Sequence, residues 1–265
     1  MRGGAQSHLI EGDDGMYYVV KFLENPQHRR ILVNELVSSI FLRYLQITAP
    51  ETRIVEATPE FLLESPQVSI ELGSKKIPVS VGRHFGSKFP GDPAQLAVYD
   101  LLPDVLLRNV QNLEDFLGAL VFDKWVSNAN SRQSIFFRAR LKHWVGGEAH
   151  PNKLGFISLM IDNGYAFNGP HWDYPDSPVQ GLYSRKQVYE KVRSIDDFQP
   201  WLDQVVHFPE EVVDQAFKQV PSEWLAGDES AFEQLLERLL RRRKRVPDLI
   251  SDCRRATVNP FPGWL

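Results

Sequence analysis

Cysteine is almost absent from this chain, and long apolar runs are missing altogether. Cys253 is the single cysteine among 265 residues, so no internal disulfide can form, which fits a reducing cytoplasm. No apolar run approaches the roughly 20 residues that a membrane-spanning helix needs. The N-terminal residues show no signal-peptide pattern. We therefore expect a cytoplasmic protein without a membrane attachment.

The chain also lacks an excess of positive charge and the residue spacing of zinc sites. Its formal charge is −4, which argues against broad nucleic-acid binding. The seven histidines form no HxxxH pair and have no cysteine partners, so a structural zinc site is not expected. The basic run at residues 241–245 ends a segment that starts with acids at 228–229, and we interpret it as a solvated helix end.

The composition that remains is that of an ordinary globular protein. Hydrophobic residues make up 43% and charged residues 24% of the chain. A chain of this length suits one large domain or two lobes around a cleft. Nothing in the sequence indicates the oligomeric state.

Strand patterns fill the first third of the chain, and helix patterns fill most of the remainder. Strands are predicted at residues 7–11, 16–23, 51–57, 67–72, 77–82, 134–139 and 155–161. Helices are predicted at residues 30–47, 94–109, 112–127, 185–194, 197–206, 209–219 and 228–245. Residues 83–93 contain many residues that break regular structure, and we expect them to connect two lobes. This predicts an α+β fold with a β-rich lobe at 1–85 and a mostly helical lobe at 86–265.

Four features follow one another along the chain in an informative order. A turn with Gly3 and Gly4 comes first, and Lys21 then stands alone inside an apolar strand. Glu35 lies on the next predicted helix, and Asp162 ends a later apolar strand with a glycine two positions on. Kinases use this layout to hold ATP and magnesium. Each feature alone is weak, but the four in this order predict a nucleotide site.

Each residue type suits the role that this layout gives it. Glycines allow backbone N–H groups to approach phosphate oxygens closely. Lys21 would pair the α- and β-phosphates, and Glu35 would hold its ammonium group. Asp162, at the end of a buried strand, needs a cation, and Mg²⁺ is one. The ordinary alternatives are a mobile chain end, a surface lysine, a solvent-facing glutamate and an Asp-Asn-Gly turn.

The segments that carry these residues resemble the stand-alone HipA-like kinases of bacteria. The resemblance lies in residues 3–9, 18–22, 25–35, 122–128, 160–168 and 181–184. It implies a bilobed phosphotransferase that uses ATP and Mg²⁺ and acts on protein serine or threonine. Gln6 and Ser7 would then join the glycines at the phosphates, and Ser7 could also be an autophosphorylation site. The family shares its fold distantly with phosphoinositide 3- and 4-kinases, and some relatives are toxins that phosphorylate a translation enzyme.

The predicted catalytic loop departs from the family pattern. The family has Asn-x-Asp, and its aspartate accepts the proton of the substrate hydroxyl, whereas this chain has Asn128-Ala129-Asn130. An amide cannot act as a general base at neutral pH. The usual metal-binding asparagine is also missing, and Gln133 or Asn128 could offer an amide oxygen to a second magnesium instead. We therefore expect the chain to bind Mg-ATP and to transfer phosphate poorly.

Three explanations for Asn130 stay open at the level of sequence. The chain could be a natural pseudokinase that serves as a nucleotide-binding scaffold, or an aspartate could have been replaced deliberately by its near-isosteric amide. Alternatively, Asp123 could act instead, because Asp123 and Asn128 match D-x-x-x-x-N in spacing, although 122–126 has the pattern of a helix interior.

Two further alternatives concern Arg132 and the substrate. Arg132 could offset charge on the transferring phosphoryl group, or it could be a surface arginine. A phosphoinositide or small-molecule kinase is a third functional interpretation, which rests on fold analogy alone.

Overall fold

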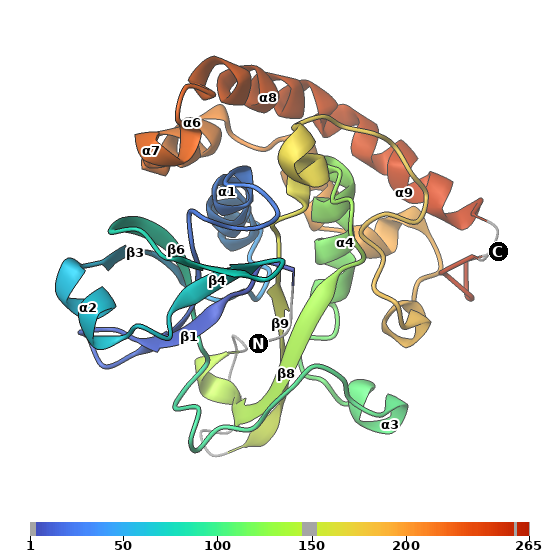
Figure 1. Ribbon diagram of the computed structural model, residues 1–265. Helices are drawn as coiled ribbons and strands as arrows, with labels where there is room; N and C mark the ends of the chain where they lie inside the picture. The colour runs from blue at the N-terminus through green and yellow to red at the C-terminus, as the bar shows by residue number, and fades with distance from the viewer. Residues whose placement is uncertain (1–3, 145–152, 257–258, 265) are drawn as a thin grey trace.

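The computed structural model describes residues 4–144, 153–256 and 259–264. Its N-terminal part is built on an antiparallel sheet with the strand order β1-β2-β6-β3 (Figure 1). The four strands are β1 (His8–Glu11), β2 (Tyr17–Lys21), β3 (Thr52–Ala57) and β6 (Gly82–Lys88). A hairpin of β4 (Ser69–Leu72) and β5 (Lys75–Pro78) and the short helix α2 (Pro59–Glu64) complete this part. Apolar residues of β2, the hairpin region and α2 form one small core.

The C-terminal part combines a second sheet with most of the helices. Strands β8 (Gln133–Arg140) and β9 (Leu154–Ile161) pair antiparallel along their whole length, and β7 (Val98–Tyr99) pairs with β8. The α-helices here are α3 (Asp104–Leu107), α4 (Asp115–Val126), α5 (Trp201–Val206), α6 (Glu210–Gln219), α7 (Ser222–Leu225), α8 (Glu229–Arg242) and α9 (Val246–Arg254). The 3-10 helices are η1 (Leu141–His143), η2 (Ala166–His171), η3 (Lys186–Tyr189), η4 (Ile195–Phe198) and η5 (Arg243–Arg245).

Helix α1 (Arg30–Tyr44) lies between these two parts. The 3.6-residue spacing of its apolar residues predicts a helix with one buried stripe, but most of its residues are buried, including the polar Asn34 and Glu35. Both faces of α1 are buried because α6 and α7, from the far end of the chain, pack on the side of α1 that the sheet leaves free (Figure 1). Arg83 of β6 pairs with Glu223 of α7 and strengthens this contact.

The α+β, two-part architecture is as predicted, but several boundaries are not. Residues 82–88 form β6 and do not belong to the predicted connection. Gly86 is a packing position there, since a Cβ atom on it would lie 2.5 Å from Cγ2 of Val55. Of the helix predicted at 94–109 only α3 exists, preceded by Pro103 in an extended conformation. The helix predicted at 185–194 is the short η3, and α2, α7 and α9 were missed.

The division into lobes at residues 85 and 86 stays a prediction. None of the helices in the described part of the chain is long and apolar enough to cross a bilayer.

His84 makes the stability of the sheet depend on pH. Its side chain is fully buried, Nδ1 accepts a hydrogen bond from the Leu23 N–H at 3.2 Å, and Nε2 lies 3.0 Å from the carbonyl oxygen of Ser80. The neutral ring with a proton on Nε2 satisfies both contacts. Burial lowers the pKa of His84 below its ordinary value, although the Ser80 carbonyl opposes the shift.

We predict that the free energy of unfolding decreases as the pH falls from 7 through about 6.5, the usual pKa of unfolded histidine. The unfolded chain binds the proton more readily than the folded one, so protonation favours unfolding. His84→Gln should flatten this dependence in urea unfolding measured between pH 7 and 5. His8 and His28 have pKa values lowered by burial as well, so a residual slope is expected. An unchanged slope in the variant would contradict the role of His84.

Candidate active site

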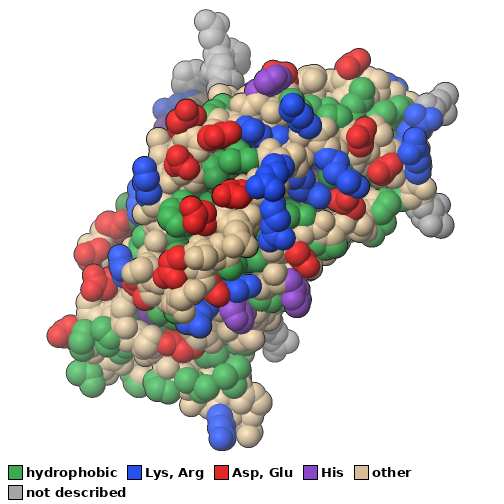
Figure 2. All heavy atoms as spheres, turned by 90° about the horizontal axis from the view of Figure 1, so that it is seen from above, with side chains coloured by type: hydrophobic (Ala, Val, Ile, Leu, Met, Phe, Trp, Pro, Cys, Tyr) green, Lys and Arg blue, Asp and Glu red, His purple; other side chains and the backbone are tan. Residues whose placement is uncertain are grey.

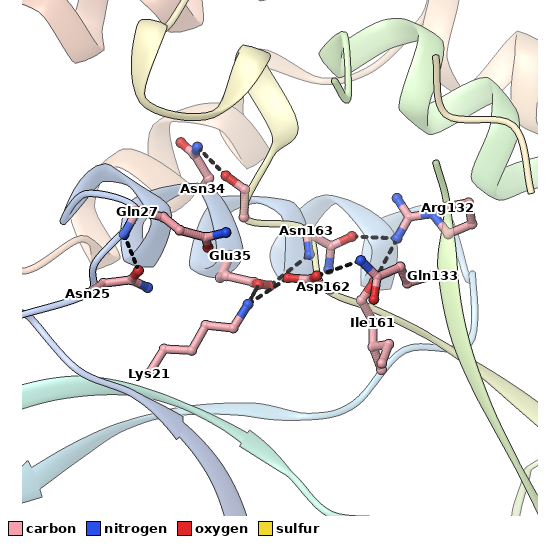
Figure 3. A network of polar contacts seen from close by, with 11 residues as sticks. Lys21, Asn25, Gln27, Asn34, Glu35, Arg132, Gln133, Ile161, Asp162 and Asn163 are labelled. Atoms are coloured by element: carbon pink, nitrogen blue, oxygen red, sulfur yellow. Dashed lines mark hydrogen bonds and ion pairs between the residues drawn. The ribbon is translucent and has the colours of Figure 1, made fainter. Parts of the chain in front are cut away.

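Lys21 is shared between two carboxylates that come from distant parts of the chain (Figure 3). Its ammonium group forms an ion pair with Glu35 and lies 2.7 Å from Oδ1 of Asp162. β2 supplies the lysine, α1 the glutamate and the end of β9 the aspartate. Lys21 is 7% and Glu35 3% exposed, whereas about a third of the Asp162 side chain, 32%, stays accessible. The predicted meeting of residues 21 and 162 across one site is therefore present in the structure.

The charges around them hold Lys21 and Asp162 in the ionised state. Burial disfavours the ammonium form of Lys21, but Glu35 and Asp162 outweigh it and raise the pKa of Lys21. Burial likewise works against the carboxylate of Asp162, but Lys21 and then Arg132 lower the pKa of Asp162. At neutral pH the trio therefore has one net negative charge. The accessible part of the trio is the Asp162 carboxylate, and hard divalent cations prefer carboxylate ligands.

The loop after β9 is bonded directly to helix α1. Asp162 has a φ of +57°, which turns the chain sharply, and the N–H of Asn163 donates to Oε2 of Glu35 at 3.0 Å. A Cβ atom on Gly164 would lie 2.6 Å from Cγ2 of Ile31. Glycine is required two residues after the aspartate because α1 passes so closely. Glu35 thus holds both the lysine and the loop that contains Asp162.

Asn34 makes the second connection, and the sequence analysis missed it. Its fully buried amide nitrogen donates to the carbonyl oxygens of Gly164 at 2.7 Å, Ala166 at 3.0 Å and Gly169 at 3.0 Å. Its oxygen accepts a hydrogen bond from Nε1 of Trp172 at 2.8 Å. A polar residue beside Glu35 on a largely apolar helix is the signal that could have identified it.

Gln133, the first residue of β8, contacts Asp162, and Asn130 lies in the loop just before it. Nε2 of Gln133 donates to Oδ2 of Asp162 at 2.8 Å, so this amide adjoins the carboxylate as a metal ligand would. Asn130 is half-buried, and its side chain makes no hydrogen bond to the described residues. Its backbone is fixed, because its N–H donates to Oδ1 of Asn128 at 3.1 Å and its carbonyl accepts from the N–H of Gly181 at 3.0 Å.

Asp123 and Arg132 form a buried ion pair below the catalytic loop. Their side chains are 0% and 1% exposed, and Nε of Arg132 lies 2.8 Å from Oδ2 of Asp123. Arg132 also donates to Oδ1 of Asn163 at 2.8 Å and to the carbonyl oxygen of Ile161 at 3.1 Å.

This ion pair corrects three predictions. The structure buries Asp123 away from any incoming hydroxyl, so it does not place Asp123 as a base. Arg132 is neither a surface arginine nor open to a transferring phosphoryl group, and it supports the loops on both sides of the site. Asn128 is also engaged on both sides of its amide, since its nitrogen donates to Oδ1 of Asp123 at 2.9 Å while its oxygen accepts from Asn130.

The glycine turn at the N-terminus fits the prediction only in part. Gly3 lies outside the described residues, and Gly4 is exposed. The Gln6 amide is not free for a nucleotide, because it donates to the carbonyl oxygen of Glu71 at 2.6 Å and accepts from the N–H of Glu71 at 2.7 Å. It thus pairs with β4 as a strand would. The role of the half-buried Ser7 at the phosphates stays a prediction.

Arginines of α8 hold the segment that follows the Asp162 loop. Seen from above, onto α8, Lys and Arg side chains gather with acidic side chains among them (Figure 2). Arg238 donates to the carbonyl oxygen of Trp172 at 2.7 Å, and Arg242 and Arg245 lie 2.6 and 2.5 Å from Asp176. The interpretation of the run 241–245 as a solvated helix end is therefore wrong for Arg242, whose side chain is 9% exposed.

The donor set fits magnesium better than a metal that needs a cage of protein ligands. Among the described residues no three His, Cys, Asp or Glu side chains are close enough to hold an ion. Mg²⁺ is usually held by one or two carboxylates together with substrate phosphates and water. Asp162 with the neighbouring amide of Gln133 fits that requirement.

The comparisons with known proteins identify the family and the fold. The family model of the HipA-like kinases matches residues 1–136, and the chain belongs to this family. Among solved structures, the crystal structure of the Golgi casein kinase with Mn/ADP bound matches with a TM-score of 0.53 at 15% identity. That match covers 96% of this chain and 71% of the other, and it shows the kinase-like fold alone. No curated protein gives a significant match.

We predict that Asn34→Asp destabilises the protein by about 2–4 kcal/mol. The variant keeps the acceptor for Trp172 but turns a carboxylate oxygen toward three carbonyl oxygens, which then have no donor. Urea unfolding measures the loss. Asn109→Asp, the same change at an exposed position, should cost less than about 0.5 kcal/mol. Equal losses for the two variants would contradict the anchoring role of Asn34.

Proposed function

We propose that this chain is an ATP- and Mg²⁺-dependent kinase of the HipA-like type that phosphorylates serine or threonine of a protein, itself included. Transfer by this particular chain is slow. The observation that carries the proposal is the position of Lys21, which bridges Glu35 and Asp162 at 2.7 Å from the latter. Membership in the HipA-like kinase family supports the reaction class.

Different residues bind the phosphates, hold the metal ion and position the loop of Asp162. Lys21 pairs the α- and β-phosphates while Glu35 keeps its ammonium group in place. The Asp162 carboxylate and the amide oxygen of Gln133 hold Mg²⁺, which requires the Gln133 amide to turn by half a rotation from its present hydrogen bond. Bound Mg²⁺ offsets the negative charge of the phosphates. The Arg132–Asp123 pair positions Asn163 beside Asp162.

A hollow at the other end of β2 suits the base of the nucleotide. It has a volume of about 780 Å³ and is lined, among others, by Met16, Tyr17, Phe89, Trp144 and Leu159. Tyr17 and Lys21 are the two ends of β2, so the strand extends from this hollow to the charged trio. The lining also includes charged side chains such as Glu11, Lys88 and Asp92, and its apolar and aromatic part, close to the segment that leaves β6, offers a surface on which a flat heteroaromatic ring can pack.

Asn130 explains why phosphate transfer is slow, and it is also the residue that supports the alternative function. At this position an aspartate would accept the proton of the attacking hydroxyl, whereas the amide is not basic enough to accept it and has no negative charge. Because phosphoryl transfer depends mainly on positioning and charge, binding of the nucleotide survives the loss of the base. The alternative function, a nucleotide-binding pseudokinase that serves as a scaffold, rests on this same residue.

We predict that ATP with Mg²⁺ raises the melting temperature and that Asp162→Asn lowers the magnesium-dependent part of this rise. Ligand at a hundredfold excess over Kd stabilises a protein by about 2.7 kcal/mol. The near-isosteric amide keeps the shape of the side chain but replaces a charged metal ligand by a neutral, weaker one. Asp13→Asn, an exposed turn position, serves as the control and should respond as the original chain does. The absence of any nucleotide effect on the original chain would overturn the proposal.

We predict that Asn130→Asp increases phosphate transfer from γ-labelled ATP by about 100-fold or more, the usual contribution of a general base. Asn109→Asp should leave the rate unchanged. Transfer is measured to the protein itself and to a mixed protein substrate. Unchanged transfer with intact ATP binding would favour the pseudokinase alternative, and strong transfer by the original chain would show that Asn130 is not limiting.

A further inference from the structure

The loop between β2 and α1 joins the strand of Lys21 to the helix of Glu35 and contains two amide side chains. Asn25 and Gln27 are labelled in Figure 3, where the Gln27 side chain extends in the direction of Glu35 and Asp162. Asn25 builds the turn, because its Oδ1 accepts the N–H of Gln27 at 2.9 Å and its backbone N–H donates to the carbonyl oxygen of Phe22 at 3.1 Å. This is an Asx turn, which fixes the direction of the next side chains.

The amide of Gln27 lies against the glycine turn. A Cβ atom on Gly4 would be 2.5 Å from Nε2 and 3.2 Å from Cδ of Gln27. Gly4 therefore lacks a side chain at the place where the Gln27 amide sits. The sequence predicts that Gln6 binds the phosphates, but the Gln6 amide is paired with β4 instead.

A buried donor without a partner marks the same loop. Nδ2 of Asn25 is buried and has no hydrogen-bond partner among the described residues, and the residue is 6% exposed. Buried amide donors are nearly always paired, because an unpaired one has lost its water without replacement. The Gln27 side chain, half-buried, makes no hydrogen bond to any residue in the ranges 4–144, 153–256 and 259–264. Within those ranges, two amides of one loop thus have donors without a partner beside the glycine turn.

The charge balance of the site favours neutral donors here. Lys21 is already neutralised by Glu35 and Asp162, and Arg132 by Asp123. A polyphosphate at this site therefore gains few direct contacts to uncompensated cations. Uncharged N–H groups bind phosphate oxygens and add no cation that would compete with a bound metal ion.

We propose that Gln27 donates a hydrogen bond from Nε2 to an oxygen of the β- or γ-phosphate of the bound nucleoside triphosphate, with Asn25 holding the loop in place. The proposal rests on the proposed function and adds a phosphate ligand to it. The contact selects for the polyphosphate tail of the nucleotide and not for the base or the ribose. It therefore contributes to the difference in affinity between ATP and AMP.

The test measures the binding of ATP and of AMP, each with Mg²⁺, by calorimetry on the full chain. Gln27→Glu replaces the donor by an anion of the same shape, and Gln27→Met keeps similar length and packing against Gly4 but has no donor. Both variants should bind ATP about tenfold more weakly or worse, because a hydrogen bond to a charged acceptor is among the stronger ones. Their affinity for AMP should change less than about twofold. Gln67→Glu, an exposed position near β4, is the control and should behave as the original chain does.

The outcomes separate this inference from the proposed function. Unchanged ATP affinity in Gln27→Met, with normal binding by the original chain, would overturn the donor role and leave the kinase proposal intact. A parallel loss for ATP and AMP would also overturn it, since that result indicates general damage to the site. Failure of the original chain to bind ATP would remove both proposals. If Gln27→Glu does not fold, Gln27→Met alone decides.

Discussion

The arrangement of this protein depends on one buried cation that two carboxylates share. Removing either Glu35 or Asp162 would leave the other paired, but removing Lys21 would leave two carboxylates facing each other at a largely buried site. Breaking a buried ion pair costs several kcal/mol because the remaining charge cannot regain its water. The N-terminal sheet, helix α1 and strand β9 are thus constrained to one relative position. The elements that form the candidate site are therefore held together by the charges of the site itself.

Helix α1 transmits this constraint to the rest of the molecule. Glu35 bonds the loop after β9 through the N–H of Asn163, and Asn34 bonds the same segment further along. On the opposite side α6 and α7 cover α1, and Arg30 pairs with Asp228 at 2.8 Å just before α8. The C-terminal helices therefore contribute to the site without contacting it. A helix enclosed in this way cannot swing outward unless these contacts break, so the lysine–glutamate pair is supported by packing on both sides of α1.

The sequence could predict those site residues that interrupt or end a run of apolar residues. Lys21 interrupts an apolar strand and Asp162 ends one, and both carry their signal in the neighbouring residues. Asp123 and Arg132 could not be placed, because whether a charged residue is buried depends on its partner, and these two are nine residues apart across a loop. Gln6 was misassigned because the backbone of β4, 65 residues away, takes up its amide. The same limit applies to α1, whose second buried face is created by helices from the far end of the chain.

Asn130 changes the electrostatics of the site as well as its proton chemistry. An aspartate at this position would add a negative charge to the loop just before Gln133, whose amide contacts the accessible carboxylate of Asp162. That charge would attract a metal ion but would also repel the phosphates of the nucleotide. The amide removes the repulsion together with the base. Under the proposed function, a site with Lys21, Glu35 and Asp162 in place and an amide at 130 would retain Mg-ATP and consume it slowly. Both effects would follow from one amide, in a loop whose backbone is held by Asn128 and Gly181.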